Sequence, residues 1–124
     1  MEKGLTYTSK TTVTQSNTAI AMGSGDMEVL ATPAMVALME NAAMNSVCAE
    51  LPQGSTTVGS MIETSHIRPS ALGDEISATA ILEEVDGRKL TFKVTATDSK
   101  GTIGEGTHIR FIVDRERFLS KLKK

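Results

Sequence analysis

Apolar residues follow two different spacings along this chain, and the change between them separates a predicted helix from predicted strands. After Thr32 almost every position is apolar for about five turns, which predicts one long helix that ends near Glu50. Thr32 is expected to cap its N-terminus, with Pro33 at the first helical position, where the missing N–H costs nothing. Pro52 and Gly54 then end the helix. Because this helix lacks a wide polar face, we expect it to be a core helix surrounded by the rest of the protein.

Elsewhere apolar positions alternate with polar ones, a spacing that is typical of strands. A first strand, rich in threonine, is expected over residues 5–14. Residues 16–30 are expected to form a loop, with or without a short helical turn, that is either a lid or an irregular surface connection. Further strands are predicted after the helix, at residues 56–68, 75–85, 88–97 and 102–113. The Asp86-Gly87 pair predicts a short hairpin, and residues 114–124 a basic amphipathic helix.

The order of these elements predicts an α+β fold with a single domain over residues 1–124. One face of a flat sheet cannot cover a helix that is apolar on all sides. A strongly curved sheet of about five strands can cover most of it, and a second subunit can cover the rest. We therefore expect a curved antiparallel sheet wrapped around one central helix, and a homodimer. Gly104 and Gly106, in the last strand, are expected to mark a bulge or a close approach of two backbones.

Composition narrows the classes of function. With a net charge of −2, 3% aromatic residues and no tryptophan, the chain has neither the charge nor the stacking surfaces of a nucleic-acid-binding protein. Its single cysteine excludes an internal disulfide, and the polar N-terminus lacks the apolar segment of a signal peptide, so a cytoplasmic location is expected. Glu40 and Asn41 interrupt the apolar helix, which argues against a membrane span. Two histidines and no acidic cluster at ligand spacing predict no metal site.

Glu40 does not fit the apolar helix that carries it. Its neighbours three and four positions away are all apolar, namely Val36, Ala37, Ala43 and Met44. A carboxylate in such surroundings is expected to be at least half buried, where an unpaired charge is costly. Glu40 therefore needs a charged partner, as in a buried salt bridge, a raised pKa or a catalytic role.

Three segments carry a resemblance to a known family: ATPAMVALMENAAM (31–44), VGSMIETSHIRPSALGD (58–74) and IGEGTHIRFIV (103–113). With these segments and the hairpin VDGRKLTFKVTATD, the chain resembles the hot-dog fold thioesterases, and among them the fluoroacetyl-CoA thioesterase-like branch. The resemblance implies a curved antiparallel sheet around one long helix and hydrolysis of an acyl-CoA, with no cofactor besides the CoA of the substrate. Fluoroacetyl specificity in that branch is associated with an aromatic lid, whereas residues 24–31 contain no aromatic side chain.

The resemblance also implies site residues. In that branch a Thr at the helix start, a Glu eight residues along and a His on the following strand form the catalytic group, and these positions hold Thr32, Glu40 and His66. A Gly whose N–H binds the thioester oxygen matches Gly59, and an Arg of the last strand, near the acyl end of the site, matches Arg110. The helical spacing places Thr32 and Glu40 within roughly 80° of each other around the axis, so one pocket can contain both.

Each of these residues also has a purely structural interpretation. Thr32 can be only an N-cap, Gly59 only a sheet irregularity, and Arg110 only a surface or interface salt bridge. A lone histidine on a strand is more often a packing residue than a catalyst. His66 is favoured as a general acid or base because its strand follows the helix with the carboxylate, whereas His108 is assigned to cross-strand packing.

The function expected from these residues is hydrolysis of a small or short-chain acyl-CoA by a homodimer or a dimer of dimers. Glu40 is expected to be the general base or the nucleophile, since the sequence does not decide between the two roles. His66 is expected to be the general acid or base, with Thr32 assisting and the N–H of Gly59 binding the oxyanion. Two alternatives remain at this point: a non-catalytic acyl-CoA binding protein, and a hot-dog dehydratase or hydratase. The absence of a dehydratase motif around His66 argues against the latter.

Overall fold

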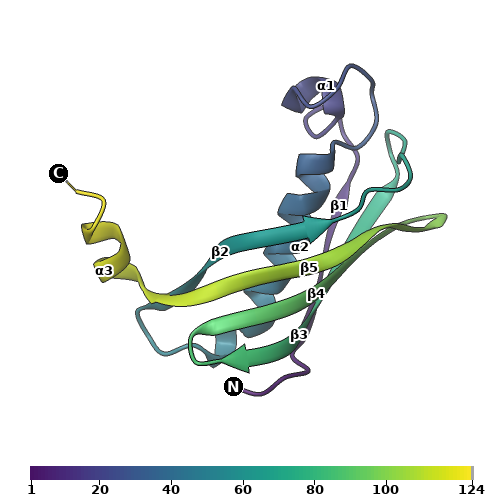
Figure 1. Cartoon of the computed structure of the whole chain (residues 1–124). Helices are drawn as coiled ribbons and strands as arrows, with labels where there is room; N and C mark the ends of the chain where they lie inside the picture. The colour runs from purple at the N-terminus through teal and green to yellow at the C-terminus, as the bar shows by residue number, and fades with distance from the viewer. Residues whose placement is uncertain (124) are drawn as a thin grey trace.

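One antiparallel sheet and one long helix make up most of the fold (Figure 1). The computed structural model describes residues 1–123. The elements are β1 (Thr6–Thr12), α1 (Ala19–Met22), α2 (Thr32–Val47), the 3-10 helix η1 (Cys48–Glu50), β2 (Ser55–Thr64), β3 (Glu75–Asp86), β4 (Lys89–Asp98), β5 (Gly101–Asp114) and α3 (Arg115–Ser120). The predicted order of strands and helices is confirmed, and α1 is the short helical turn within the loop that precedes the long helix.

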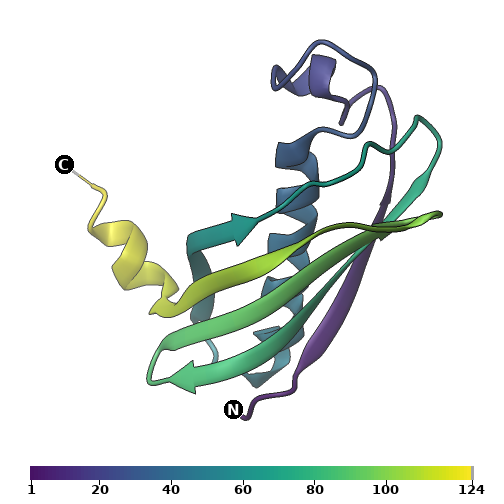
Figure 2. The same cartoon turned by 45° about the vertical axis from the view of Figure 1, so that its right-hand side comes forward.

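The sheet has five strands in the order β1-β3-β4-β5-β2, and every neighbouring pair is antiparallel. It curls around α2, which lies along its concave side, whereas α3 projects outward from the end of β5 (Figures 1 and 2). β1 and β2 form the two edges of the sheet. The curved sheet around a single long helix is the arrangement that the sequence predicts.

The side of α2 that faces the sheet supplies the centre of the core. Met35, Met39, Ala42, Ala43 and Val47 are fully buried, and they form one cluster with apolar side chains of the strands. Burial of a methionine or valine side chain contributes about 1.5–3 kcal/mol to folding. The apolar stretch of the sequence is therefore a core helix, as expected.

The opposite side of α2 is open to solvent in a single chain. Ala37, Asn41 and Met44 are exposed, and the Met44 side chain retains 37% of its accessible surface. The sheet curls around only one side of the helix (Figure 2), so this chain leaves uncovered a part of α2 of the kind that the sequence analysis assigns to a second subunit.

Thr32 is not the N-cap of α2, which corrects the prediction from its sequence position. Ala31 occupies the cap position without a side-chain hydrogen bond, and Thr32 is the first helical residue, followed by Pro33. The physical reason lies in the backbone: Ala31 is extended, and its carbonyl already accepts the Met35 N–H at 3.1 Å as the first helical hydrogen bond, while the Thr32 hydroxyl contacts His66.

The strand that follows α2 is shorter than predicted. β2 ends two residues before His66, so this histidine does not lie on a strand. The chain still follows β5 beyond that point, because the Ser65 N–H donates to the Glu105 carbonyl at 3.1 Å and the Ile67 N–H to the Ile103 carbonyl at 2.7 Å. His66 therefore sits between two backbone hydrogen bonds, just outside the regular ladder.

Gly104 and Gly106 allow this close contact between β5 and the chain that ends β2. A Cβ at Gly104 would lie 2.9 Å from the sulfur of Met35 and would clash with the carbonyl oxygen of Ser65. A Cβ at Gly106 would clash with the carbonyl oxygen of Glu63. The predicted close approach of two backbones is confirmed.

The β3–β4 hairpin turns one residue later than the Asp86-Gly87 pair predicts. Asp86 and Lys89 still pair across the two strands, so the loop consists of Gly87 and Arg88. Gly87 has a φ of 61°, a conformation that glycine adopts without strain.

The predicted C-terminal helix is present as α3. It begins after Asp114, whose carboxylate accepts the N–H of Arg117 at 3.0 Å as an N-cap. The last residue of the predicted segment, Lys124, lies outside the described residues. Across residues 1–123, none of the helices has the length and hydropathy that a membrane crossing requires.

Candidate active site

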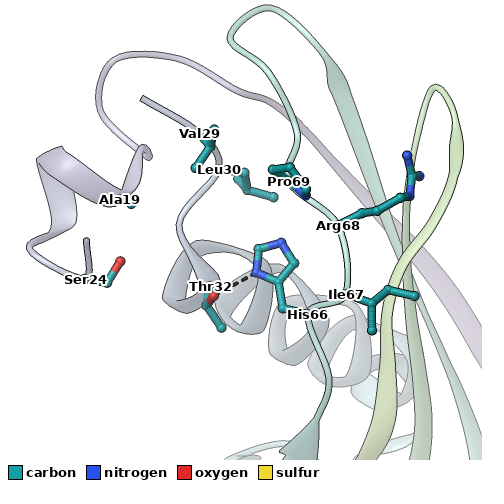
Figure 3. Close-up of a pocket in the computed structure, with 9 residues that line it drawn as sticks. All are labelled: Ala19, Ser24, Val29, Leu30, Thr32, His66, Ile67, Arg68 and Pro69. Carbon is teal, nitrogen blue, oxygen red and sulfur yellow. Dashed lines mark hydrogen bonds between the residues drawn. The ribbon is translucent and has the colours of Figure 1, made fainter. Parts of the chain in front are cut away.

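Thr32 and His66 meet at the N-terminal end of α2 (Figure 3). The Thr32 hydroxyl and Nδ1 of His66 are 2.7 Å apart, although the two residues are separated by 34 positions in the sequence. The first turn of α2 holds the threonine, and the backbone hydrogen bonds on either side of His66 hold the histidine against β5. Two of the three predicted catalytic residues are therefore in direct contact.

The surroundings of His66 favour its neutral form. Burial lowers the pKa of His66, although the nearby backbone of Arg68 acts in the opposite direction. Its Nε2 is buried and has no hydrogen-bond partner within residues 1–123. A neutral imidazole can either accept the hydroxyl proton of Thr32 at Nδ1 or donate from Nδ1 to the Thr32 oxygen. In the first arrangement the Thr32 hydroxyl becomes more nucleophilic. In the second, the Thr32 oxygen accepts a hydrogen bond from the ring, which fixes its position.

A cavity of about 230 Å³ lies beside this pair. It is lined by Ala19, Ser24, Val29, Leu30, Thr32, His66, Ile67, Arg68 and Pro69. In Figure 3 the segment between α1 and α2 forms one side of the cavity, and the stretch that follows β2 forms the other. The cavity is smaller than the roughly 300–1,000 Å³ of typical ligand pockets. Its size therefore suits a small chemical group, and the loop before α2 forms one of its walls.

Glu40 belongs to a second polar group, which surrounds Gly59 of β2. A Cβ at Gly59 would lie 3.1 Å from Oε2 of Glu40, 3.2 Å from Cε1 of His108 and 3.4 Å from Nη1 of Arg110. The pairing of β2 with β5 also shifts by one residue between Gly59 and Met61. Such an irregularity interrupts the ladder and re-aims the groups next to it. Three polar side chains therefore converge on the backbone of Gly59, where the strand is irregular.

The Glu40 carboxylate is paired but accessible. Its side chain is 41% exposed, and its Oε2 lies 3.8 Å from Nη1 of Arg110, whose own side chain is 7% exposed. At this distance the contact is an ion pair and not a hydrogen bond. The expectation that the carboxylate is at least half buried is confirmed, and the partner that its burial requires is Arg110.

Arg110 is a buried residue, so its interpretation as a surface salt bridge is wrong. Its Nε donates to the hydroxyl of Thr57 at 2.8 Å, and its Nη2 donates to the Thr57 carbonyl at 2.9 Å. Burial lowers the pKa of Arg110, and the charge of Glu40 raises it. The guanidinium keeps its charge under physiological conditions. Arg110 is therefore a fixed positive charge on the side of the sheet that faces α2, beside the Glu40 carboxylate.

His108 also belongs to this group, although the sequence favours a packing role for it. Its Nδ1 lies 2.8 Å from the Met61 carbonyl, and its Nε2 lies 3.2 Å from Nη1 of Arg110. Burial lowers the pKa of His108; the hydrogen bond with Met61 raises it, the Arg110 charge lowers it and the Glu40 charge raises it. The missed signal was spacing: two residues apart on one strand, His108 and Arg110 share a face.

The predicted site residues thus form two groups in one chain. Thr32 and His66 line the cavity, whereas Glu40, Gly59 and Arg110 are not among its lining residues. The helical spacing separates Thr32 from Glu40 by roughly 12 Å along the axis of α2. The single-pocket prediction requires one cavity that contains both ends of the site. This cavity contains only the end with Thr32 and His66. Residues 1–123 hold no group of three or more His, Cys, Asp or Glu side chains that could bind a metal ion.

Comparison with known proteins places the chain in a family of acyl-CoA hydrolases. Residues 13–116 match the family described as fluoroacetyl-CoA-specific thioesterase. The chain is 36% identical over 97 residues to the fluoroacetyl-CoA thioesterase of Streptantibioticus cattleyicolor, which corresponds to 78% of this chain and 70% of that protein.

Solved structures of similar proteins share the fold of this chain. The fold matches a structure of the fluoroacetyl-CoA thioesterase FlK with a TM-score of 0.93 and 31% identity, over 98% of this chain and 95% of that one. It also matches a hot-dog-like protein from Thermanaerovibrio acidaminovorans with a TM-score of 0.89 and 24% identity, over 98% and 90% of the two chains. The second match is a likeness of fold alone.

Proposed function

The chain belongs to the fluoroacetyl-CoA-specific thioesterase family and is a thioester hydrolase of the hot-dog fold, and on this premise we propose that it hydrolyses a small or short-chain acyl-CoA to the free acid and CoA. The observation that carries the proposal is the Glu40 carboxylate, which is 41% exposed on a core helix and adjoins the backbone of Gly59. A carboxylate beside the backbone of a glycine at an irregular point of a strand can act as a base, and the glycine N–H is the proposed oxyanion donor.

Two chemical routes use this arrangement. As a general base, Glu40 accepts a proton from water while the water oxygen attacks the thioester carbonyl carbon. As a nucleophile, the Glu40 carboxylate attacks the same carbon, and departure of the CoA thiolate leaves an anhydride, which water then hydrolyses. In both routes the carbonyl oxygen becomes an oxyanion that the N–H of Gly59 stabilises, and the fixed charge of Arg110 favours the same negative charge. The C–S bond then breaks and CoA leaves as a thiolate.

Thr32 and His66 are proposed to deliver a proton to the CoA thiolate. A neutral imidazole can accept the proton that Glu40 took from water, relayed through a water molecule, and pass it on, so His66 can protonate the departing thiolate. The Thr32 hydroxyl, 2.7 Å from Nδ1, orients the ring for this step. The cavity beside the pair suits a short acyl group, and its loop wall, residues 24–31, carries no aromatic side chain.

We also propose that the active form is a homodimer. The uncovered side of α2 carries exposed Ala37 and Met44, and Glu40 lies on the same helix with part of its side chain open to solvent. A second copy packed on this side would bury the apolar surface. It would also enclose the substrate between the two polar groups, which lie roughly 12 Å apart along one helix.

The test of the proposal compares wild type with Glu40→Gln and Glu40→Ala on a panel of acyl-CoA thioesters, with free thiol as the readout. The panel runs from acetyl- and fluoroacetyl-CoA to medium-chain thioesters. Wild type is expected to prefer the small acyl groups, and both variants are expected to lose at least about 10²-fold in kcat, because the base or nucleophile is gone. Glu40→Gln preserves the size of the side chain, so circular dichroism and sedimentation should show the wild-type fold and association state.

Glu50→Gln is the matched control, because Glu50 is an exposed glutamate in η1, directly after the same helix. It is expected to hydrolyse the panel like wild type. A Glu40→Gln variant with wild-type turnover would contradict the proposed function.

A further inference from the structure

His108 is a buried histidine that the proposed reaction does not use. It is 1% exposed and lies on β5, between the strand carrying Gly59 and the strand β4. Its ring packs against Phe92 with the ring centroids 6.2 Å apart. Both ring nitrogens have partners within the chain, the Met61 carbonyl for Nδ1 and Arg110 for Nε2. A buried, fully partnered ring has one fixed orientation, so the question is what that orientation determines.

The two partners of His108 dictate its tautomer. A guanidinium has only donors, so Nη1 of Arg110 donates to Nε2 of His108, and Nε2 must carry a lone pair. A backbone carbonyl only accepts, so Nδ1 must carry the hydrogen and donate to Met61. His108 is therefore a neutral imidazole with its proton on Nδ1. Protonation of Nε2 would remove the acceptor and place a second positive charge beside the guanidinium.

The Arg110 side chain is fixed by three hydrogen bonds, and His108 supplies one of them. The other two, to the hydroxyl and the carbonyl of Thr57, hold Nε and Nη2. Nη1 is the nitrogen that lies 3.8 Å from Oε2 of Glu40, and His108 is its only hydrogen-bond partner within residues 1–123. The histidine therefore fixes the nitrogen that faces the carboxylate.

The other end of the imidazole fixes the backbone next to the site. Met61 is the residue at which the pairing of β2 with β5 resumes after the irregularity that follows Gly59. The hydrogen bond from Nδ1 to its carbonyl ties this stretch to the same ring that holds Arg110. The His108 side chain thus contacts both the irregular backbone of β2 and the Arg110 guanidinium, and the guanidinium in turn contacts the Glu40 carboxylate.

We infer that His108 is a positioning residue for the thioesterase site: its bond to the Met61 carbonyl fixes the Nδ1–H tautomer, and Nε2 then holds Nη1 of Arg110 against Glu40. This inference rests on the proposed function, because it assigns His108 a role in the reaction of Glu40. The competing interpretation is a packing role, in which any side chain of similar size serves equally well.

Two substitutions separate the two hydrogen bonds of the ring. In His108→Gln the amide oxygen can take the place of Nε2 and accept from Arg110, whereas the bond to Met61 is lost. In His108→Asn the shorter amide can take the place of Nδ1 and donate to Met61, whereas Arg110 loses its acceptor. Thr107→Val is the control, because Thr107 neighbours His108 on β5 and its side chain is on the other face of the sheet.

The expected kinetic result is a difference between the two variants. His108→Gln and Thr107→Val are expected to keep kcat within about threefold of wild type, and His108→Asn to lose at least about tenfold in kcat with a smaller change in KM. Long-range proton–nitrogen NMR spectra of the wild-type protein are expected to show the Nδ1–H tautomer for His108 at neutral pH.

Equal kcat values for His108→Gln and His108→Asn would overturn the inference, as would an Nε2–H tautomer. Loss of kcat in Glu40→Gln with full activity in His108→Asn would overturn the role of His108 alone. Absence of hydrolysis by wild type on the whole panel would overturn the proposed function and this inference with it.

Discussion

Gly59 occupies a space in which a side chain cannot fit without moving the groups around it. A methyl group there would lie 3.1 Å from the Glu40 carboxylate and 3.2 Å from the His108 ring. Both contacts are tight, so the carboxylate or the imidazole must move by a few tenths of an ångström. Because rates depend on sub-ångström placement of reacting groups, the glycine is expected to matter for turnover more than for folding.

We therefore predict that Gly59→Ala lowers kcat by roughly tenfold or more, with a shift in melting temperature of only a few degrees. Thiol release and thermal unfolding measure the two effects. Ser60→Ala is the control, since Ser60 is the exposed residue next to Gly59 and its hydroxyl donates to the Ile109 carbonyl at 3.4 Å. Wild-type kcat in Gly59→Ala would contradict the view that the groups around this glycine are placed for catalysis.

Single residues show both the reach and the limit of the sequence argument. Glu40 stood out because a charge among apolar helical neighbours needs a reason, and its partner is present 3.8 Å away. The local pattern around Thr32 indicates only a helix cap, because its contact with His66 joins residues 34 positions apart. His108 gives no signal by itself, because its role comes from Arg110, two residues along the same strand.

At the scale of elements, the stretch between β2 and β3 carries His66 and is anchored by one carboxylate. Asp98, at the end of β4, accepts hydrogen bonds from Arg68 at 2.9 Å and from Ser70 at 2.8 Å, and from the Lys100 N–H at 2.8 Å. Burial would raise the pKa of Asp98, but these hydrogen bonds and the Arg68 charge lower it below its ordinary value. Asp98 thus ties the stretch that carries His66 to the β4–β5 hairpin.

We predict that Asp98→Ala destabilises the protein by about 1–3 kcal/mol, because the buried hydroxyl of Ser70 and the Arg68 guanidinium lose their acceptor. It should also lower kcat, because the neighbouring His66 is no longer held at hydrogen-bonding distance from Thr32. Urea unfolding and thiol release measure the two effects. Asp86→Ala, at the exposed hairpin on the other end of β4, is the control. Full stability with full activity in Asp98→Ala would show that this anchor is dispensable.

A helix or strand can be predicted from the sequence where its apolar residues follow a single regular spacing. The period of the apolar residues found α2, and alternation found all five strands within a few residues of their ends. The end of β2 was missed because the backbone continues beside β5 without regular pairing, and only Gly104 and Gly106 signalled that contact. Which side of α2 stays uncovered depends on the direction in which the sheet curls, and no local pattern of residues states it.

For the molecule as a whole, the response to pH is governed near neutrality by two histidines. The chain has no others, and burial lowers the pKa of both His66 and His108 in the folded state. In the unfolded chain each returns to about 6.5. The unfolded chain therefore binds more protons than the folded one at pH values between the folded and unfolded pKa values. Asp98 acts only in a more acidic range, because its pKa lies below the ordinary value of about 3.9.

We accordingly predict that the free energy of unfolding is constant above about pH 6.5, falls as the pH decreases from there toward the lowered folded-state pKa values of the two histidines, and levels off below them. Urea unfolding at half-unit steps from pH 8 to pH 5 measures the slope. The double variant His66→Asn/His108→Gln carries no titrating imidazole, so its slope over the same range should be close to zero, whatever its absolute stability. If wild type and the double variant share one slope, the buried imidazoles are not its source, and the neutral states assigned to His66 and His108 would have to be abandoned.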